Sequence, residues 1–261
     1  MTHTFQLLLM RLKLSFSEAM HDRVDFLIGI LGDLLITILS LVTIGIIYNN
    51  VSSLGGWTKM GAFLILGFYQ VLNSFGNVVL ANNLQRLPHQ VRYGQLDPLL
   101  TQPIDIQINL IRRFNFQESF EGVAGFVIVV FALHALHVPF SITTVTLILG
   151  SLVLGTVFLW SLYFLISSLG FWLVRFDNLT NLAGVIQSLA RLPANAYGRT
   201  AEVVFRSIIP IAVIATLPAE VLTRTAVPTL AVISITSALT LFVLSRLVFM
   251  YALNSYSSAS S

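Results

Sequence analysis

The stretch FLIGILGDLLITILSLVTIGIIY, residues 26–48, decides the class of fold. Fifteen of these residues are Leu, Ile, Val or Phe, and each favours the middle of a bilayer by about 0.3–0.6 kcal/mol. Asp33 costs about 3 kcal/mol at the bilayer centre and less near a helix end, so the apolar side chains outweigh it. Because about 20 mostly apolar residues suffice to cross a bilayer, the stretch predicts a membrane-spanning helix.

Five further spans are expected on the same grounds. They are residues 61–80, 120–137, part of 141–174, 179–197 with Pro193 inside, and 226–251. The chain is 56% hydrophobic and 10% charged, which leaves too little polar surface for a sizeable water-soluble domain. We therefore expect an all-α polytopic membrane protein with six transmembrane helices, in which residues 1–251 form a single transmembrane domain and residues 252–261 form a polar tail.

The N-terminal residues have a different pattern. Apolar residues between Phe5 and Met20 recur at helical spacing, with polar and basic residues on other faces. This pattern predicts an amphipathic helix within residues 1–25 that lies flat in the membrane interface.

A second exception precedes the last span. Residues 205–221 are apolar for too short a length to cross a bilayer, and Pro210 and Pro218 interrupt them. Broken helices of this kind are typical of re-entrant segments. We expect an extracytoplasmic re-entrant hairpin within residues 199–225.

The charged residues set the orientation and exclude some partners. With both termini in the cytoplasm, nine basic residues face inside and four face outside, as the positive-inside rule requires. The net charge of +3 is small and its basic residues are scattered, so nucleic acid is not an expected partner. The chain has no cysteine, and His134 and His137 have no third ligand nearby, so no metal site is expected.

The longest polar interval, residues 81–119, is predicted to lie in the cytoplasm between spans 2 and 3. Within it, residues 91–105 read VRYGQLDPLLTQPID. Gly94 favours a turn, Asp97 is a helix-capping residue, and Pro98 suits the first helical position. Pro103 disfavours helix at the preceding residue, so a helix of about one turn is expected.

This short helix would display Leu99 and Leu100 to the cytoplasm. Apolar residues presented on a short helix are suited to docking into a groove of another protein. Packing of the same helix against its own bundle is an equal alternative from the sequence alone.

The interval resembles a motif of one transporter family. The pattern Arg-x-Gly-x-Leu-Asp-x-x-Leu-x-x-Pro occurs in a bacterial export subgroup of type 2 ATP-binding-cassette (ABC) transporter permeases. Its positions are occupied here by Arg92, Gly94, Leu96, Asp97, Leu100 and Pro103. The order of the other elements is also similar, and residues 191–222 resemble the family's fifth-span exit and hairpin, although Leu192 stands where an aromatic residue is common.

The resemblance implies a subunit of an ATP-driven exporter in the bacterial plasma (inner) membrane. Two permease chains would form the pathway, with a heteromer favoured over a homodimer. ABC ATPase subunits would bind the N-terminal amphipathic helix and the short helix between spans 2 and 3, which would serve as the coupling helix. ATP and magnesium would bind to those ATPases, because this chain has no phosphate-binding loop of the Gly-x-x-x-x-Gly-Lys-[Ser/Thr] type. No cofactor and no catalytic residue are expected on this chain.

Two other functions stay open at this stage. An intramembrane lipid- or peptide-processing enzyme would need a catalytic cluster, and the chain has no Gly-x-Ser-x-Gly elbow. An ATP-independent transporter would fit the proline-broken hairpin. The transported substrate is not indicated by the sequence.

Several polar residues fall within the predicted spans. Gln70, Asn73, Ser74 and Asn77 share one face of span 2 and either line the pathway or bond to neighbouring helices. Arg191 either lines the pathway or neutralises Asp177 or Glu202.

Three carboxylates also fall within the predicted spans or at their ends. Asp33 is expected to pair with Arg23 or with an arginine of the polar interval. Glu118 and Glu121 are interpreted as favourable charges at a helix N-terminus.

Overall fold

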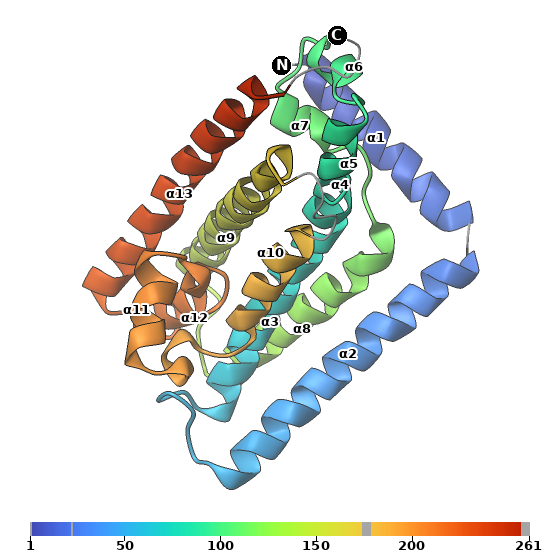
Figure 1. Ribbon diagram of the computed structural model, residues 1–261. Coiled ribbons are helices and arrows are strands. Elements are labelled where there is room, and N and C mark those ends of the chain that lie inside the picture. Colours follow the sequence, from blue (N-terminus) through green and yellow to red (C-terminus); the bar gives the residue numbers. More distant parts are fainter. Residues whose placement is uncertain (1, 22, 174–178, 257–261) are drawn as a thin grey trace.

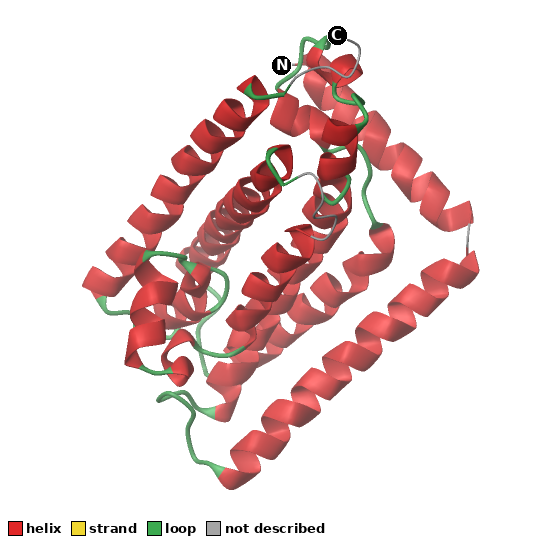
Figure 2. Cartoon of the chain, in the orientation of Figure 1, coloured by secondary structure: helices red, strands yellow, loops and turns green. Residues whose placement is uncertain are grey.

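The computed structural model describes residues 2–21, 23–173 and 179–256, and the chain there is helical (Figures 1 and 2). Its described part contains no strand, only an isolated bridge between Leu54 and Trp57. Five described helical segments are long and apolar enough to cross a membrane. They are Arg23–Asn50 (α2), Lys59–Arg92 (α3 to α5), Phe116–Ala135 (with α8, Ser119–Ala135), Ile142–Phe171 (with α9, Ile142–Ser168) and Pro228–Asn254 (α13). The polytopic all-α class is thus confirmed.

The N-terminal helix α1, Thr2–His21, meets α2 at a sharp angle (Figure 1). Phe5, Met10 and Leu14 on α1 are exposed, as an interfacial helix requires. The expected boundary at residue 25 was too late, because α2 already begins at Arg23.

The second span is longer than predicted. Helix α3, Lys59–Phe75, continues through a π-helical turn, Gly76–Ala81, into α4, Asn82–Leu84, and α5, Leu87–Arg92. The predicted span ended at residue 80, and residues 81–119 were expected to lie in the cytoplasm. The observed helical segment instead continues into that interval as far as Arg92. The absence of a side chain at Gly76 lets the amide of Gln187 approach the backbone of this turn, since a Cβ on Gly76 would lie 3.0 Å from the Gln187 Oε1 atom.

The predicted fifth span is shorter than expected. Helix α10, Leu179–Ser188, ends in a 3₁₀ turn, Leu189–Arg191, and the backbone is then extended. Pro193 therefore follows the helix and does not lie inside it. Proline removes a backbone donor and clashes with the preceding turn, which explains the early end.

The segment before α13 is a pair of short helices. Helix α11, Arg199–Ser207, leads through a 3₁₀ turn, Ile211–Val213, to α12, Thr216–Leu222. Residues 211–217 are buried, and the two helices lie at the end of the bundle opposite α6 (Figure 1).

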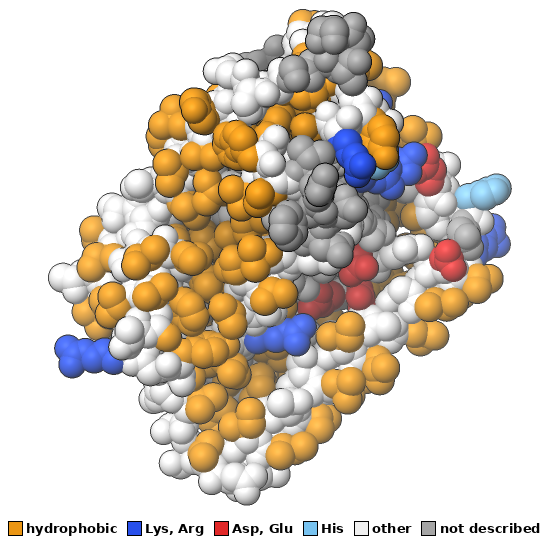
Figure 3. Space-filling model, viewed as in Figure 1, with side chains coloured by type: hydrophobic (Ala, Val, Ile, Leu, Met, Phe, Trp, Pro, Cys, Tyr) orange, Lys and Arg blue, Asp and Glu red, His pale blue; other side chains and the backbone are white. Residues whose placement is uncertain are grey.

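Helices α3 and α8 pack backbone to backbone at the centre of the bundle. A Cβ on Gly67 would lie 2.9 Å from the Gly125 carbonyl, and a Cβ on Gly125 would lie 2.8 Å from the Gly67 carbonyl. Small residues of this kind allow close helix contact in membranes. The outer faces of the bundle carry exposed apolar side chains (Figure 3).

Candidate functional site: the coupling segment and a polar cluster

The interval after α5 forms two short helices, α6 (Asp97–Leu100) and α7 (Ile106–Leu110). Gly94 has a φ of 68° in the turn before α6, a conformation that a residue with a Cβ rarely adopts. The expected one-turn helix is therefore present, and Pro103 lies in the bend beyond it. We call residues 92–110 the coupling segment.

Only one of the two leucines expected to be displayed is exposed. Leu100 is 41% exposed, whereas Leu99 is 3% and Leu96 is 1% exposed. Leu96 and Leu99 are three residues apart and face the bundle together. The expectation for Leu99 was wrong, and the exposed surface is made by Leu100, Tyr93 and Arg92.

Asp97 does not cap α6 with its side chain, contrary to expectation. Leu96 holds the N-cap position, with no side-chain cap bond. Instead, the hydroxyl of Tyr256 donates to Asp97 Oδ1 at 2.9 Å. Burial and the bond to Asp97 raise the pKa of the Tyr256 phenol, so it stays protonated and able to donate at neutral pH.

Side-chain bonds join the coupling segment to α1. Arg11 donates to Asn109 Oδ1 at 2.7 Å and to the Ile111 carbonyl at 2.9 Å. Asn109, which is fully buried, donates to the Leu99 carbonyl at 3.0 Å. A continuous chain of hydrogen bonds thus runs from α1 to α6.

A second connection reaches α13. Arg246 forms a bidentate ion pair with Asp105, with one N–O distance of 3.0 Å. Asp105 also accepts from the Gln107 backbone at 3.0 Å and so caps α7. Tyr256, two residues beyond the end of α13 (Pro228–Asn254), binds Asp97, so the C-terminal part of the chain holds the coupling segment at two places.

A polar cluster lies within the spans where α2, α3 and α8 meet. Asn73 donates to Glu121 Oε2 at 2.6 Å, and Gln70 donates to Thr37 Oγ1 at 3.0 Å. Asp33 accepts from the backbone N–H of Glu121 at 3.0 Å. The expected pairing of Asp33 with an arginine was therefore wrong, because the first turn of α8 provides its donor.

The polar residues of span 2 divide by environment. Gln70 and Asn73 form the interhelical bonds above, and Ser74 donates to the Glu118 carbonyl at 2.8 Å. Asn77, in the π-turn, is half-buried, and its side chain forms no hydrogen bond to another described residue. Interhelical bonding thus accounts for most of this face, and Asn77 is left available.

Arg191 is exposed and lies over the ring of Tyr69, 5.2 Å from its centroid. Of the alternatives left open for Arg191, pairing with Glu202 is not observed, because Glu202 pairs with Arg206 at 3.0 Å. Asp177 lies outside the described residues. Arg191 borders a cavity of about 520 Å³ between α2 and the end of α10.

Sequence reasoning missed the partners that organise both regions. Arg11 and Tyr256 are brought to the coupling segment from distant parts of the chain, and Asn109 within the segment receives the bond from Arg11. Glu121 was expected to be a favourable charge at a helix N-terminus, but its hydrogen bond with Asn73 was not expected. For the polar cluster, the sequence signal was a polar residue, such as Asn73, inside an apolar run. Such a signal does not identify the residue to which the polar side chain bonds.

In the described ranges there is no group of three or more His, Asp or Glu residues that could hold a metal ion.

The fold and these two regions define a polytopic helical membrane protein with a structured segment at one end. The sequence profile of the ABC-2 family transporter proteins matches residues 34–260, and the chain belongs to that family. It is therefore a membrane permease component of an ABC transporter and is not itself catalytic. Members of this family normally work with ABC ATPase subunits. None of the curated proteins compared with the chain matches it.

Proposed function

We propose that the chain is the permease of an exporter in the bacterial inner membrane, driven by a separate ABC ATPase that docks on the coupling segment. The observation that carries this proposal is the pair of side-chain connections from the coupling segment to α1 and α13. A displacement of α6 by a docked subunit would be transmitted to both helices. ATP and magnesium would remain on that subunit.

The docking surface would consist of Arg92, Tyr93 and Leu100, which are exposed at one end of the bundle. Both chain termini would lie in the cytoplasm with it, since α1 starts and α13 ends at this end of the bundle (Figure 1). The chain would then cross the membrane a sixth time through α10 and the turn after it. The hairpin of α11 and α12 would re-enter the membrane from the outer side.

A second permease chain would complete the pathway, as a heteromer and not as a homodimer. The cavity beside Arg191 and the exposed apolar side chains of α2, such as Leu35 and Leu39, support a partner on this face. Asn77 and Arg191 would contribute polar groups to the pathway. Copurification of differently tagged copies of this chain would refute the heteromer.

The function is tested by a charge placed on the docking surface. Leu100→Glu is compared with Val51→Glu, because both residues are 41% exposed and Val51 lies in the loop after α2, at the other end. Each variant is affinity-purified from its native membrane in mild detergent, and the retained ATPase is quantified. We expect Leu100→Glu to lose the ATPase and transport, while Val51→Glu keeps both. If Leu100→Glu retains as much ATPase as the wild type and transports as fast, the docking proposal is refuted.

A further inference from the structure

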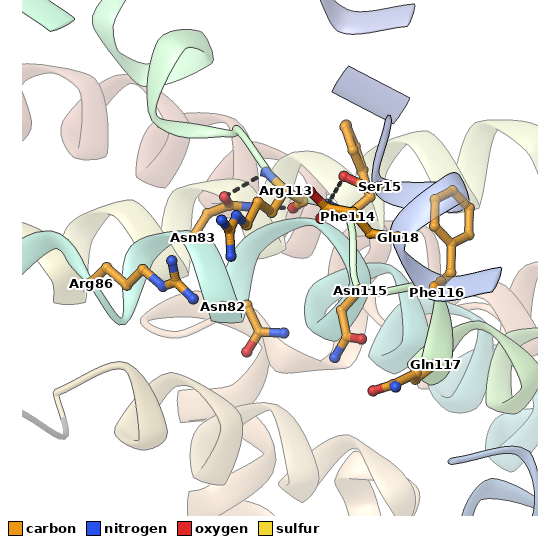
Figure 4. A pocket seen from close by; sticks show the side chains of 11 residues that line it. Ser15, Glu18, Asn82, Asn83, Arg86, Arg113, Phe114, Asn115, Phe116 and Gln117 are labelled. Atoms are coloured by element: carbon orange, nitrogen blue, oxygen red, sulfur yellow. Dashed lines mark hydrogen bonds between the residues drawn. The ribbon is translucent and has the colours of Figure 1, made fainter. Parts of the chain in front are cut away.

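Two adjoining cavities lie beside α1 at the end of the bundle that carries the coupling segment, and Figure 4 shows the lining of the first. Their volumes are about 380 and 350 Å³. The residues that line both are Ser15, Glu18, Asn83, Arg86 and Arg113. The cavities are therefore two parts of one site between α1, α4 and the strand-like segment before α8.

The site has a strong excess of positive charge. Among the described residues, Arg11, Arg86, Arg112 and Arg113 line it, and Glu18 is the one carboxylate. None of these arginines forms a salt bridge with another described residue. Burial and the neighbouring charge of Arg112 lower the pKa of the Arg11 guanidinium, as expected where cations are crowded together.

The arginines are held in place by their backbone. Asn83 Oδ1 accepts from the backbone N–H groups of Arg112 and Arg113, each at 3.0 Å, and its amide donates to the Arg113 carbonyl at 2.6 Å. Ser15 Oγ accepts from the Phe114 backbone at 3.1 Å. The backbone that carries Arg112 and Arg113 is thus fixed from α4 and from α1.

The guanidinium groups themselves remain available. Those of Arg86, Arg112 and Arg113 donate no hydrogen bond to any residue in the described ranges, whereas Arg11 binds Asn109. Figure 4 shows the side chains of Arg86 and Arg113 directed toward one another. Paired guanidinium groups of this kind match the oxygen atoms of a phosphate, which they bind through charge-assisted hydrogen bonds.

An apolar surface adjoins the site. Leu14 lines one cavity and is 62% exposed, and Phe16, two residues further along α1, is also exposed. Acyl chains would contact this surface while a phosphate occupies the cavity. Basic pockets at the cytoplasmic membrane surface bind anionic lipid headgroups in this way.

We propose that this site binds the phosphate of an anionic phospholipid, with Arg86, Arg112 and Arg113 as its donors and with α1 against the acyl chains. The polar groups of Asn115 and Glu18 border the same space and would accept hydrogen bonds from headgroup hydroxyls. Lipid bound here contacts both α1 and the segment leading into α8. It would thereby anchor α1 independently of any docked ATPase.

The test uses the full-length chain purified in detergent and native mass spectrometry with titrated phosphatidylglycerol or phosphatidylcholine. Arg86→Gln/Arg113→Gln is compared with Arg199→Gln/Arg224→Gln, which removes two exposed arginines from the opposite end. We expect wild type and control to bind phosphatidylglycerol more tightly than phosphatidylcholine. The cavity variant should lose at least about tenfold in phosphatidylglycerol affinity.

Single Arg86→Gln, whose guanidinium has no described partner, provides a folded variant if the double variant aggregates. It should still weaken phosphatidylglycerol binding several-fold. Inorganic phosphate at millimolar concentration is added in a separate arm. Unchanged phosphatidylglycerol affinity in Arg86→Gln, equal binding of phosphatidylcholine, or full displacement of the lipid by inorganic phosphate would each overturn the proposal.

Discussion

The guanidinium of Arg11 on α1 donates a 2.7 Å hydrogen bond to the side-chain carbonyl of Asn109 on α7, across 98 residues of sequence. The amide of the same asparagine donates to the Leu99 carbonyl. Asn109 therefore joins the N-terminal helix to the one-turn helix α6. A motion of α6 cannot leave α1 unaffected while both bonds persist.

Replacement of Asn109 by leucine should uncouple α1 from α6. The change leaves the Leu99 carbonyl and the Arg11 guanidinium without this partner, and each unsatisfied buried group costs about 1–3 kcal/mol. We expect a lower midpoint of thermal unfolding in detergent and impaired transport. Asn82→Leu is the control, because Asn82 is exposed and its side chain forms no hydrogen bond within the described ranges. Equal midpoints in the two variants would refute the connection.

The hairpin between α11 and α12 provides a second prediction. Arg206 is 2% exposed and binds Glu220 through two hydrogen bonds, and it also binds Glu202. Glu220→Gln removes the charge that balances a buried guanidinium, and loss of one partner from a buried pair costs about 3–5 kcal/mol.

Glu202→Gln is the matched change at the more exposed partner, whose side chain is 25% exposed against 11% for Glu220. Its effect should be about 1 kcal/mol or less, as for partly exposed pairs. Protease accessibility of the hairpin and thermal unfolding both measure the difference. A larger effect of Glu202→Gln than of Glu220→Gln would contradict the assignment of Glu220 as the main partner.

A third prediction concerns the polar cluster within the spans. Asn73→Leu would deprive the Glu121 carboxylate of its 2.6 Å donor at a site 5% exposed. We expect destabilisation of about 1–3 kcal/mol, because the acceptor is buried and would lose its donor. Asn77→Leu, one helical turn away, removes an amide that has no hydrogen bond in the described part of the chain. It should leave stability unchanged, and a drop in transport in this variant alone would support a pathway role for Asn77.

The apolar runs allowed most spans to be predicted to within a few residues, because bilayer thickness fixes their length. The first span, expected at 26–48, is α2 at Arg23–Asn50, and the third and sixth agree similarly with α8 and α13. The fifth span was expected to continue through Pro193, but the helix ends before this residue. The backbone constraint of proline overrides the apolar composition there.

The candidate site was less predictable, because its geometry depends on distant contacts. The motif correctly indicated a turn at Gly94 and a short helix after it. It could not separate Leu99 from Leu100, since the choice depends on how α6 packs against Asn109 and α7. Asp33 likewise found a backbone donor on α8 that no sequence pattern reveals.

The backbone contact between α3 and α8 provides the last prediction. Gly125 on α8 leaves no room for a side chain, because an added Cβ would lie 2.7 Å from Gln70 Cβ and 2.8 Å from the Gly67 carbonyl. Gly125→Ala must therefore separate α3 from α8 and weaken their contact. Gly150→Ala on α9 is the matched control, because nothing lies within 4 Å of an added Cβ there; alanine should even favour the helix by up to about 1 kcal/mol. We expect Gly125→Ala to lower the midpoint of thermal unfolding and Gly150→Ala to keep or raise it, and the opposite order would show that α3 and α8 do not pack at this distance.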